Sequence, residues 1–467
     1  MRAYLYEYRI NSKRKEKKMK KLLCMIMALA MIFSLCACGG SNSPTASSEN
    51  TEAANSEASS DGPVTISVWS GYPDQQEWFD WLVPAFEAAN PNIKVELTSF
   101  PIADFETKVF AAIPAGTCAD VITINPSYVY SFAGAGKFAE VPDELKQLVK
   151  SGIYDEAVVK ECSYDGEVVC VPHMLSNAAW FYNIQYFEDA GLVDANGEPI
   201  LPTNMEEVIE TASKLAKRDA SGKLTNSGIS LRITGANSGT CEKWWVLLMQ
   251  YGGKLLDEVS EGKYVAGYNN QAGFDTMRFY LRNLYEYGSD NYEVEHDTGA
   301  FIAGETAMFA REASVIVEAA KHPELRYGTF PMFNANIAIT KSWYVLDNGD
   351  STKEDAAWKF IEFANSEESM IKFHHLGGYQ PARKDLDVDT LVAGVDQREA
   401  FFKNFDTVYT YVAIDEFQEI MVKMADRLLG AYENQNLLTD DDALWKFLEE
   451  MADETNALLK ENGHYGG

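Results

Sequence analysis

The alternation of strand-like and helix-like segments after Val64 constrains the fold of this chain more than any other feature. Residues 64–69, Val-Thr-Ile-Ser-Val-Trp, alternate in polarity and are rich in β-branched side chains, as strands are. Segments with apolar residues at helical spacing follow each strand, so we expect strands at 64–69, 93–97 and 120–124 and helices at 75–89 and 105–113. Strands that alternate with helices predict an α/β fold with a largely parallel sheet.

Residues that directly follow two of these strands are candidates for ligand binding. The carboxyl ends of parallel strands meet at one edge of a sheet, and ligands of open α/β folds bind outside that edge. We therefore expect ligand contacts from Trp69, Ser70 and Tyr72 after the first strand, and from Asn125, Ser127 and Tyr128 after the third.

The length and composition of the chain predict a globular protein with two lobes. The 467 residues exceed what one hydrophobic core usually serves. Apolar residues make up 46% of the chain and aromatic residues 12%, which is typical of a folded protein.

The N-terminal segment has the features of an export signal. Lys20 and Lys21 precede an apolar run, Leu22–Leu35, that is shorter than the ~20 residues of a membrane-spanning helix. The ending Leu35-Cys36-Ala37-Cys38 resembles a bacterial lipoprotein cleavage box, which implies a lipid on Cys38 and an anchor at the extracytoplasmic face of the cell membrane. The alternative is an uncut membrane-spanning helix.

The segments around Cys38 complete this interpretation. Residues 1–37 form the signal peptide, and a start at Met19 instead of Met1 would give it ordinary proportions. Residues 38–61 are rich in Ser, Asn, Thr, Ala and Glu and poor in large apolar residues, so we expect a flexible tether between anchor and fold.

The charge of the chain excludes one class of partner. The formal charge is −30, and residues 1–37 hold nine Lys or Arg and two Asp or Glu, so the chain without them carries −37. Such an acidic protein repels phosphate backbones and anionic lipids. We expect no nucleic-acid binding, and membrane contact only through the anchor.

Four of the seven cysteines lie beyond the tether, and two of these flank a predicted hairpin. Cys162 and Cys170 enclose a turn at Asp165-Gly166, and the export context permits a disulfide between them. A two-residue turn places Cys162 opposite Val169, however, one residue out of register. The sequence leaves both states open.

Sequence signatures of catalysis and metal binding are absent. The six histidines show no HExxH spacing, no Gly-x-Ser-x-Gly turn or phosphate-binding loop occurs, and no Cys/His spacing suggests zinc. We therefore expect no cofactor, no metal and no enzymatic activity.

Tryptophans near predicted strand ends suggest a binding surface for sugars. Aromatic rings cover the flat C–H faces of sugars, while polar side chains bind their hydroxyls. Trp69, Trp244 and Trp343 fit either this role or a place in the core.

Several further stretches occur in an order that points to one family. They are residues 65–69, 86–95 (Phe-Glu-Ala-Ala-Asn-Pro-Asn-Ile-Lys-Val), 115–121, 180–183 with 187–192 (Trp-Phe-Tyr-Asn, then Phe-Glu-Asp-Ala-Gly-Leu), 301–308, 358–361 and 378–383. In this order they resemble the extracellular solute-binding proteins of carbohydrate ABC importers, the family that includes maltodextrin binders. The chain departs from that family at Ala119, where Pro is usual, and at residues 311–314, Arg-Glu-Ala-Ser, where relatives have Gly-x-Trp.

The resemblance implies a fold and further contact residues. It implies a type II, two-lobe periplasmic-binding-protein-like fold with discontinuous lobes and a ligand cleft between them. Lobe 1 would comprise residues 62–173 and 343–384, and lobe 2 residues 178–340 and 388–467. The matching positions imply ligand contacts from Ser176 and Asn177, and the departure at 311–314 offers Arg311 and Glu312 instead of an aromatic ring.

The resemblance implies capture of a sugar for delivery to an ABC permease, and we expect that sugar to be an oligosaccharide. The protein would act as a monomer and release its ligand unchanged. Two alternatives remain at this point: a receptor that reports ligand to a membrane sensor, and a surface glycan hydrolase.

Overall fold

The computed structural model describes residues 62–235, 237–296, 298–403 and 408–467. The predicted signal peptide, Cys38 and the predicted tether lie outside these ranges. Within them, no helix combines the length and the apolar character needed to span a membrane.

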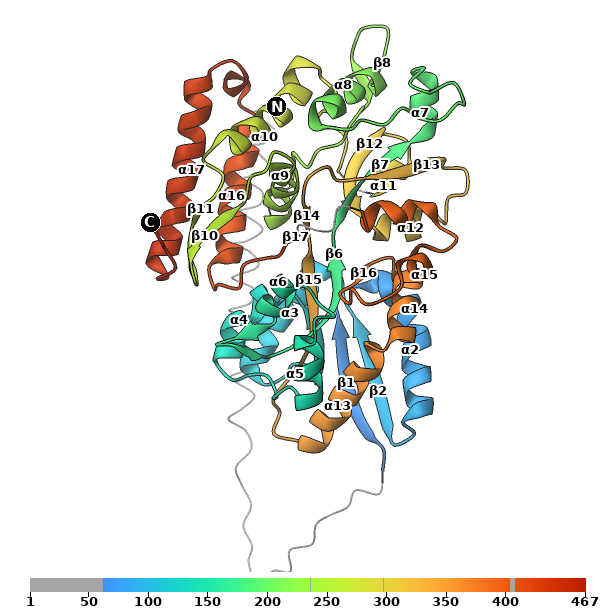
Figure 1. Cartoon of the computed structure of the whole chain (residues 1–467), viewed down its shortest axis with the longest axis vertical. Helices are drawn as coiled ribbons and strands as arrows, with labels where there is room; N and C mark the ends of the chain where they lie inside the picture. Colours follow the sequence, from blue (N-terminus) through green and yellow to red (C-terminus); the bar gives the residue numbers. More distant parts are fainter. Residues whose placement is uncertain (1–61, 236, 297, 404–407) are drawn as a thin grey trace, which may run out of the picture. The chain divides into compact units, whose positions relative to one another are not determined.

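The described chain builds two large hydrophobic cores. The first contains Ile66, Trp78 and Trp343, and the second contains Trp180 and Trp244. We call the elements around the first core lobe 1 and those around the second core lobe 2; they occupy the lower and upper parts of Figure 1.

Lobe 1 is built on a six-stranded sheet in the order β16-β6-β15-β3-β1-β2. Its strands are β1 (Val64–Ser70), β2 (Ile93–Ser99), β3 (Val121–Ile124), β6 (Val171–Ser176), β15 (Ile339–Val345) and β16 (Gln380–Pro381). The α/β prediction is confirmed. The sheet is mixed, however, because β1 pairs parallel with β2 and β3 whereas β15 is antiparallel to β3 and β6. The expected parallel sheet covers only half of these strands, since β15 enters from lobe 2 and runs against its neighbours.

Helices pack on this sheet and form the rest of lobe 1. They are α2 (Gln76–Ala89), α3 (Ile102–Ala115), α4 (Pro126–Gly134), α5 (Asp143–Lys150), α6 (Glu156–Glu161), α13 (Ser351–Ala364), α14 (Glu367–Gly377) and α15 (Val388–Val392), with a short 3-10 turn η1 (Pro73–Gln75). Helix α2 buries the apolar residues from which it was predicted: Trp78, Leu82 and Phe86 lie on one buried face.

Lobe 2 contains a three-stranded antiparallel sheet, β12-β7-β13, and most of the C-terminal helices. The sheet strands are β7 (Ala178–Asn183), β12 (Met308–Glu312) and β13 (Tyr327–Pro331). Two short hairpins join β8 (Lys217–Arg218) to β9 (Leu224–Asn226) and β10 (Leu256–Ser260) to β11 (Lys263–Ala266).

The helices of lobe 2 surround this sheet and the second core. They are α7 (Ile184–Asp189), α8 (Met205–Leu215), α9 (Ser238–Gln250), α10 (Gln271–Leu281), η2 (Arg282–Glu286), α11 (Thr298–Ile302), α12 (Ser314–Ala319), η3 (Asp396–Phe401), α16 (Phe417–Tyr432), η4 (Gln435–Leu438) and α17 (Asp441–Glu461). Asn237 and Asp440 cap α9 and α17 by accepting backbone N–H groups.

The chain passes between the cores along neighbouring segments (Figure 1). It leaves lobe 1 from β6 to β7 and returns from β14 (Asn336–Ile337) to β15. It leaves again after α15, because Leu391 still packs in the first core whereas Phe401 packs with Phe181 of lobe 2. Strand β17 (Val408–Tyr409) then pairs with β14.

The predicted hairpin at 162–170 is present, but its cysteines are free thiols. Strands β4 (Ser163–Tyr164) and β5 (Glu167–Val168) pair across the turn, and the Val169 N–H donates to the Cys162 carbonyl at 3.0 Å. This is the expected register. Both thiols are buried in lobe 1, and a disulfide between them in an oxidising environment stays a prediction.

Candidate functional site

We call the region where the two lobes face each other the cleft, and its lobe 1 side carries tyrosines and carboxylates. Tyr72 follows β1, Glu106 lies on α3, Tyr128 on α4, and Tyr379 follows the end of α14. The Tyr379 ring lies edge-on to Tyr72, with ring centres 5.8 Å apart, and its hydroxyl donates to Asp74 at 2.8 Å. Burial raises the pKa of Tyr72 well above its ordinary value, so this hydroxyl stays protonated at neutral pH.

Lys341 extends from the strand that joins the lobes. The register of β15 against β6 shifts between Lys341 and Ser342, because His173 is an extra residue in β6 at this point. Such bulges change the direction of nearby side chains. The Lys341 ammonium lies 5.4 Å from the ring centre of Tyr128. Burial lowers the pKa of Lys341, and the carboxylates of Glu106 and Glu242 act against that fall.

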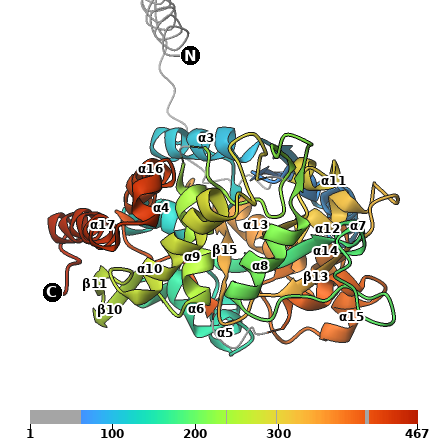
Figure 2. The same ribbon diagram turned by 90° about the horizontal axis from the view of Figure 1, so that it is seen from above.

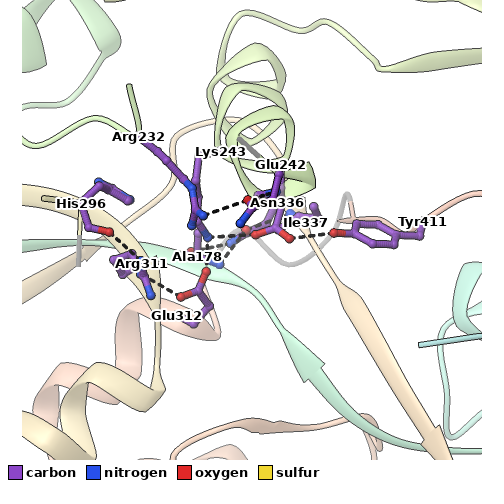
Figure 3. A network of polar contacts seen from close by, with 12 residues as sticks. Ala178, Arg232, Glu242, Lys243, His296, Arg311, Glu312, Asn336, Ile337 and Tyr411 are labelled. Carbon is purple, nitrogen blue, oxygen red and sulfur yellow. Dashed lines mark hydrogen bonds and ion pairs between the residues drawn. The ribbon is translucent and has the colours of Figure 1, made fainter. Parts of the chain in front are cut away.

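The wall that lobe 2 contributes is a network of charged groups (Figure 3). Glu242 and Lys243 come from α9, and Arg311 and Glu312 from the end of β12. Lys243 bonds both carboxylates, reaching Glu242 at 3.0 Å, and Arg311 Nε donates to Glu312 at 3.0 Å. The Tyr411 hydroxyl donates to Glu242 at 2.7 Å.

The network holds Glu312 in its charged form. Burial by itself raises the pKa of this carboxyl, but the charges of Arg311 and Lys243 outweigh burial and hold the pKa well below its usual range. The Arg311 guanidinium is fixed further by donating to the His296 carbonyl at 2.9 Å. Because these groups bind one another, they present a defined set of donors and acceptors to the cleft.

Two contacts join the walls at opposite ends of the cleft. At one end the rings of Tyr128 and Tyr411 stack with centres 6.4 Å apart, and Ser238 and Gln418 of lobe 2 lie beside the Tyr128 hydroxyl. At the other end Gly378 approaches α12 so closely that a Cβ there would lie 2.7 Å from Val317 Cγ2. The lobes are therefore in contact on both sides of the charged groups.

Four of the residues expected from the sequence lie among these groups. Tyr72 and Tyr128 contact other cleft residues, and Arg311 and Glu312 belong to the charged network. Ser176, at the end of β6, is partly exposed and pairs with Ile339.

Two of the three candidate tryptophans are core residues. Trp244 and Trp343 are fully buried, in the second and the first core, because each sits on the inner face of its helix or strand. Trp69 packs against Phe100, with ring centres 5.5 Å apart, under the Lys108 ammonium at 4.5 Å. The structure thus assigns none of these rings to the cleft wall.

Four other predicted ligand-binding residues have buried side chains, and three of these form hydrogen bonds with backbone groups. Ser70 accepts the Tyr72 N–H at 3.2 Å, and Asn125 caps α4 by accepting the Ser127 N–H while donating to the Thr340 carbonyl at 2.9 Å. Asn177 donates to the Phe401 carbonyl at 2.8 Å, across the crossing between the lobes. All four of these side chains, Ser127 included, are buried. They position the cleft residues instead of facing them.

Comparison with known proteins identifies the family. The sequence profile described as bacterial extracellular solute-binding protein matches residues 81–399, more than half of the chain. The chain belongs to this family.

Relatives of this solute-binding protein are binding proteins themselves. A binding protein of Brucella abortus (strain 2308) is 24% identical over 337 residues, which cover 69% of this chain and 77% of the relative. An erythritol/L-threitol-binding protein of Mycolicibacterium smegmatis is 22% identical over 421 residues, 81% of this chain and 82% of the relative.

Solved structures share the fold. The cyclic α-maltosyl-1,6-maltose binding protein of Arthrobacter globiformis superimposes with a TM-score of 0.68 at 19% identity, covering 86% of this chain and 100% of that protein. A Mycobacterium tuberculosis protein in complex with glycerophosphocholine gives 0.69 at 18% identity, covering 86% and 99%. The predicted two-lobe fold is confirmed by these likenesses.

Several residues in the cleft of this solute-binding protein could not be predicted from the sequence. Asp74, Glu106, Glu242, Lys341 and Tyr379 were missed, since each is one polar residue among many and comes to the cleft only through tertiary packing. The departure from the family at residues 311–314 was the one signal that pointed to the charged network.

The chemistry available at the cleft of the solute-binding protein is recognition by hydrogen bonds and charge. Tyrosine hydroxyls, carboxylates, a guanidinium and two ammonium groups converge there. Among the described residues, no group of three or more His, Cys, Asp or Glu side chains is placed to hold a metal ion.

Proposed function

We propose that this protein captures a carbohydrate between its two lobes and delivers it, unchanged, to the permease of an ABC importer. The observation that carries the proposal is the meeting of hydrogen-bonding groups from both lobes in one cleft: Tyr72, Glu106 and Tyr379 from lobe 1 and Glu242 and Glu312 from lobe 2. Carboxylates and tyrosine hydroxyls, three of them held by hydrogen bonds or ion pairs, suit a ligand covered with hydroxyl groups.

The mechanism follows from the position of these groups. A ligand that bonds to both walls binds the closed form of the protein better than an open form. It therefore shifts the population of protein molecules toward the closed form. The crossings between the lobes would absorb this motion. The permease would then recognise the closed form.

The location and the state of assembly belong to the same proposal. A lipid on Cys38 would hold the protein at the extracytoplasmic face of the membrane beside its permease. Residues 38–61 would act as a tether that lets the folded lobes contact the permease. We expect the protein to act as a monomer, since one chain supplies both walls of the cleft.

A calorimetric titration of the purified protein with mono-, di- and oligosaccharides and sugar alcohols tests the function. We expect saturable binding of at least one compound, with the compound recovered intact by mass spectrometry. The proposal would be contradicted if no compound gave a heat of binding, or if cleaved products were released.

A matched pair of variants ties the binding to the cleft. Glu312→Ala removes the partner of Arg311 and Lys243 and is expected to weaken binding at least tenfold. Glu318→Ala, on the exposed side of α12, leaves the cleft intact and is expected to bind as the unchanged protein does.

A further inference from the structure

An ion pair outside the cleft residues described above joins the two lobes. Lys160 lies on α6, whose Val158 packs in the first core, and Glu258 lies on β10, whose Leu256 packs in the second core. The Lys160 ammonium is 2.8 Å from both carboxylate oxygens of Glu258. Among the residues that the structure describes, this is the one ion pair that links lobe 1 to lobe 2. We call it the interlobe ion pair, and the lobes have to break it when they separate at this edge.

Lobe 2 holds the carboxylate of the interlobe ion pair in place. One oxygen of Glu258 accepts the Gly262 N–H at 3.1 Å and the Tyr264 hydroxyl at 3.4 Å. The hairpin β10–β11 is fixed in turn to α17, because the Ala266 N–H donates to the side-chain oxygen of Asn456 at 2.8 Å. A carboxylate that is held in this way loses little freedom when the ammonium of lobe 1 approaches, which reduces the entropic cost of an exposed ion pair.

The surroundings of the interlobe ion pair are open to solvent. A cavity of about 900 Å³ lies beside it, with Tyr130 and Asp165 of lobe 1 and Tyr264 of lobe 2 among its lining residues. The ion pair therefore spans a space that apolar side chains do not fill. Of the two side chains, 61% of Lys160 and 36% of Glu258 are exposed, so dissolved salt reaches both charges.

We propose that the interlobe ion pair stabilises the closed form of the protein and thereby strengthens ligand binding from outside the cleft. Lys160 and Glu258 are positioning residues in this account, because they act on the ligand only through the positions of the lobes. An exposed ion pair changes such an equilibrium by roughly two- to fivefold. The proposal rests on the lobe closure of the proposed function, but it does not depend on which compound is bound.

Loss of the interlobe ion pair changes one of two quantities, depending on which form of the ligand-free protein is more populated. If the closed form dominates, the lobes separate and the radius of gyration rises. If the open form dominates, closure around a ligand becomes less favourable and the dissociation constant rises. Small-angle X-ray scattering of the full ligand-free protein measures the first quantity. Calorimetry with glucose, galactose, maltose, maltotriose and erythritol measures the second.

Three variants separate the interlobe ion pair from a general effect on folding. Lys160→Glu places two carboxylates against each other, and we expect a larger radius of gyration or a dissociation constant raised by roughly two- to fivefold. The exchange Lys160→Glu with Glu258→Lys restores opposite charges and is expected to return both quantities toward those of the unchanged protein. Lys94→Glu breaks an ion pair with Glu87 inside lobe 1 and is expected to change neither quantity.

Ionic strength supplies a readout that a merely structural role of Lys160 would not move. Salt screens exposed charges, so the difference between Lys160→Glu and the unchanged protein should shrink from about 0.02 M to about 0.5 M sodium chloride. A difference that stays constant over this range would show that the substitution disturbs packing, and it would overturn the proposal.

Two further outcomes would also overturn the proposal. One is an unchanged value for Lys160→Glu in every quantity that is measured, and the other is an exchange variant that behaves no better than Lys160→Glu. If none of the five compounds binds, the result counts against the proposed function, and the radius of gyration then decides alone whether the ion pair favours closure.

Discussion

At the scale of single residues, Glu161 is a buried carboxyl below the cleft whose protonation affects stability. In the part of the chain that the structure describes, neither of its oxygens has a hydrogen-bond partner, although Thr340 and Asn125 lie beside it. Burial raises the pKa of Glu161 to about 8. The folded protein therefore keeps a proton here that the unfolded chain releases near its ordinary value of 4.5.

The sign of the resulting pH dependence follows from this difference. The protonated carboxyl contributes its stability below the unfolded pKa, and that contribution is lost as the pH rises toward 8. Glu161→Gln cannot ionise, so its free energy of unfolding relative to the unchanged protein should rise between pH 5 and pH 8.5 by a few kcal/mol, at about 1.4 kcal/mol per pKa unit. Urea denaturation at both pH values measures this. Glu156→Gln, exposed on the same helix, is the control and should show no such rise.

The burial of Trp244 leads to a second prediction at this scale. Its ring lies in the second core, edge-on to Tyr268, and within the described residues its indole N–H has no partner. Trp244→Phe therefore loses volume but no hydrogen bond. We expect a lower melting temperature, corresponding to about 1–3 kcal/mol, with an unchanged dissociation constant for the ligand. A normal melting temperature with weakened binding would show that the ring contacts the ligand.

At the scale of elements, the close approach of Gly378 to α12 is the contact that closes one end of the cleft. Gly378 has a φ of 75°, and a Cβ there would lie 3.1 Å from the Ser314 Cα, in the other lobe. Gly378→Ala should hold the lobes apart and weaken ligand binding at least tenfold.

A second glycine provides the control for this experiment. Gly349 has a φ of 73°, and a Cβ there would meet no atom within 4 Å. Gly349→Ala thus adds the same backbone strain, about 1 kcal/mol, without the obstruction. Equal dissociation constants for the two alanine variants would show that Gly378 does not serve closure.

The elements also show which parts of the structure could be foreseen from the sequence. The strands and helices between Val64 and Ile124 were predictable because their periodicity is local. The antiparallel entry of β15 was not, since its direction depends on the passage of the chain through lobe 2. For the same reason Lys341 was missed: its position depends on a bulge formed with His173, far away in sequence.

In the candidate site, too, local sequence patterns predicted some residues, whereas others depend on tertiary packing. Tyr72 and Tyr128 were predicted because they directly follow strands whose ends meet. The sequence left Trp343 open between cleft and core because a strand residue faces either one, and the sequence alone does not determine which. Tyr379 comes to the cleft through the end of α14 and its contact with α12, which no local pattern encodes.

At the scale of the whole molecule, the proposed lipid on Cys38 would determine where the lobes act. Cys38→Ala should block lipidation and release the protein from the membrane, because an uncut apolar run of this length is too short for a stable span. Membrane fractionation measures this, and Cys36→Ala is the matched control. Full retention of the Cys38→Ala protein in membranes would contradict the anchor.

The central claim is that one ligand is held jointly by both lobes, and a titration of three proteins tests it directly. The unchanged protein, Glu106→Ala in lobe 1 and Glu242→Ala in lobe 2 are titrated with the tightest-binding sugar. We predict one ligand per chain for the unchanged protein and at least tenfold weaker binding for each variant. Affinity that depends on one lobe alone, or a stoichiometry of two, would contradict capture between the lobes.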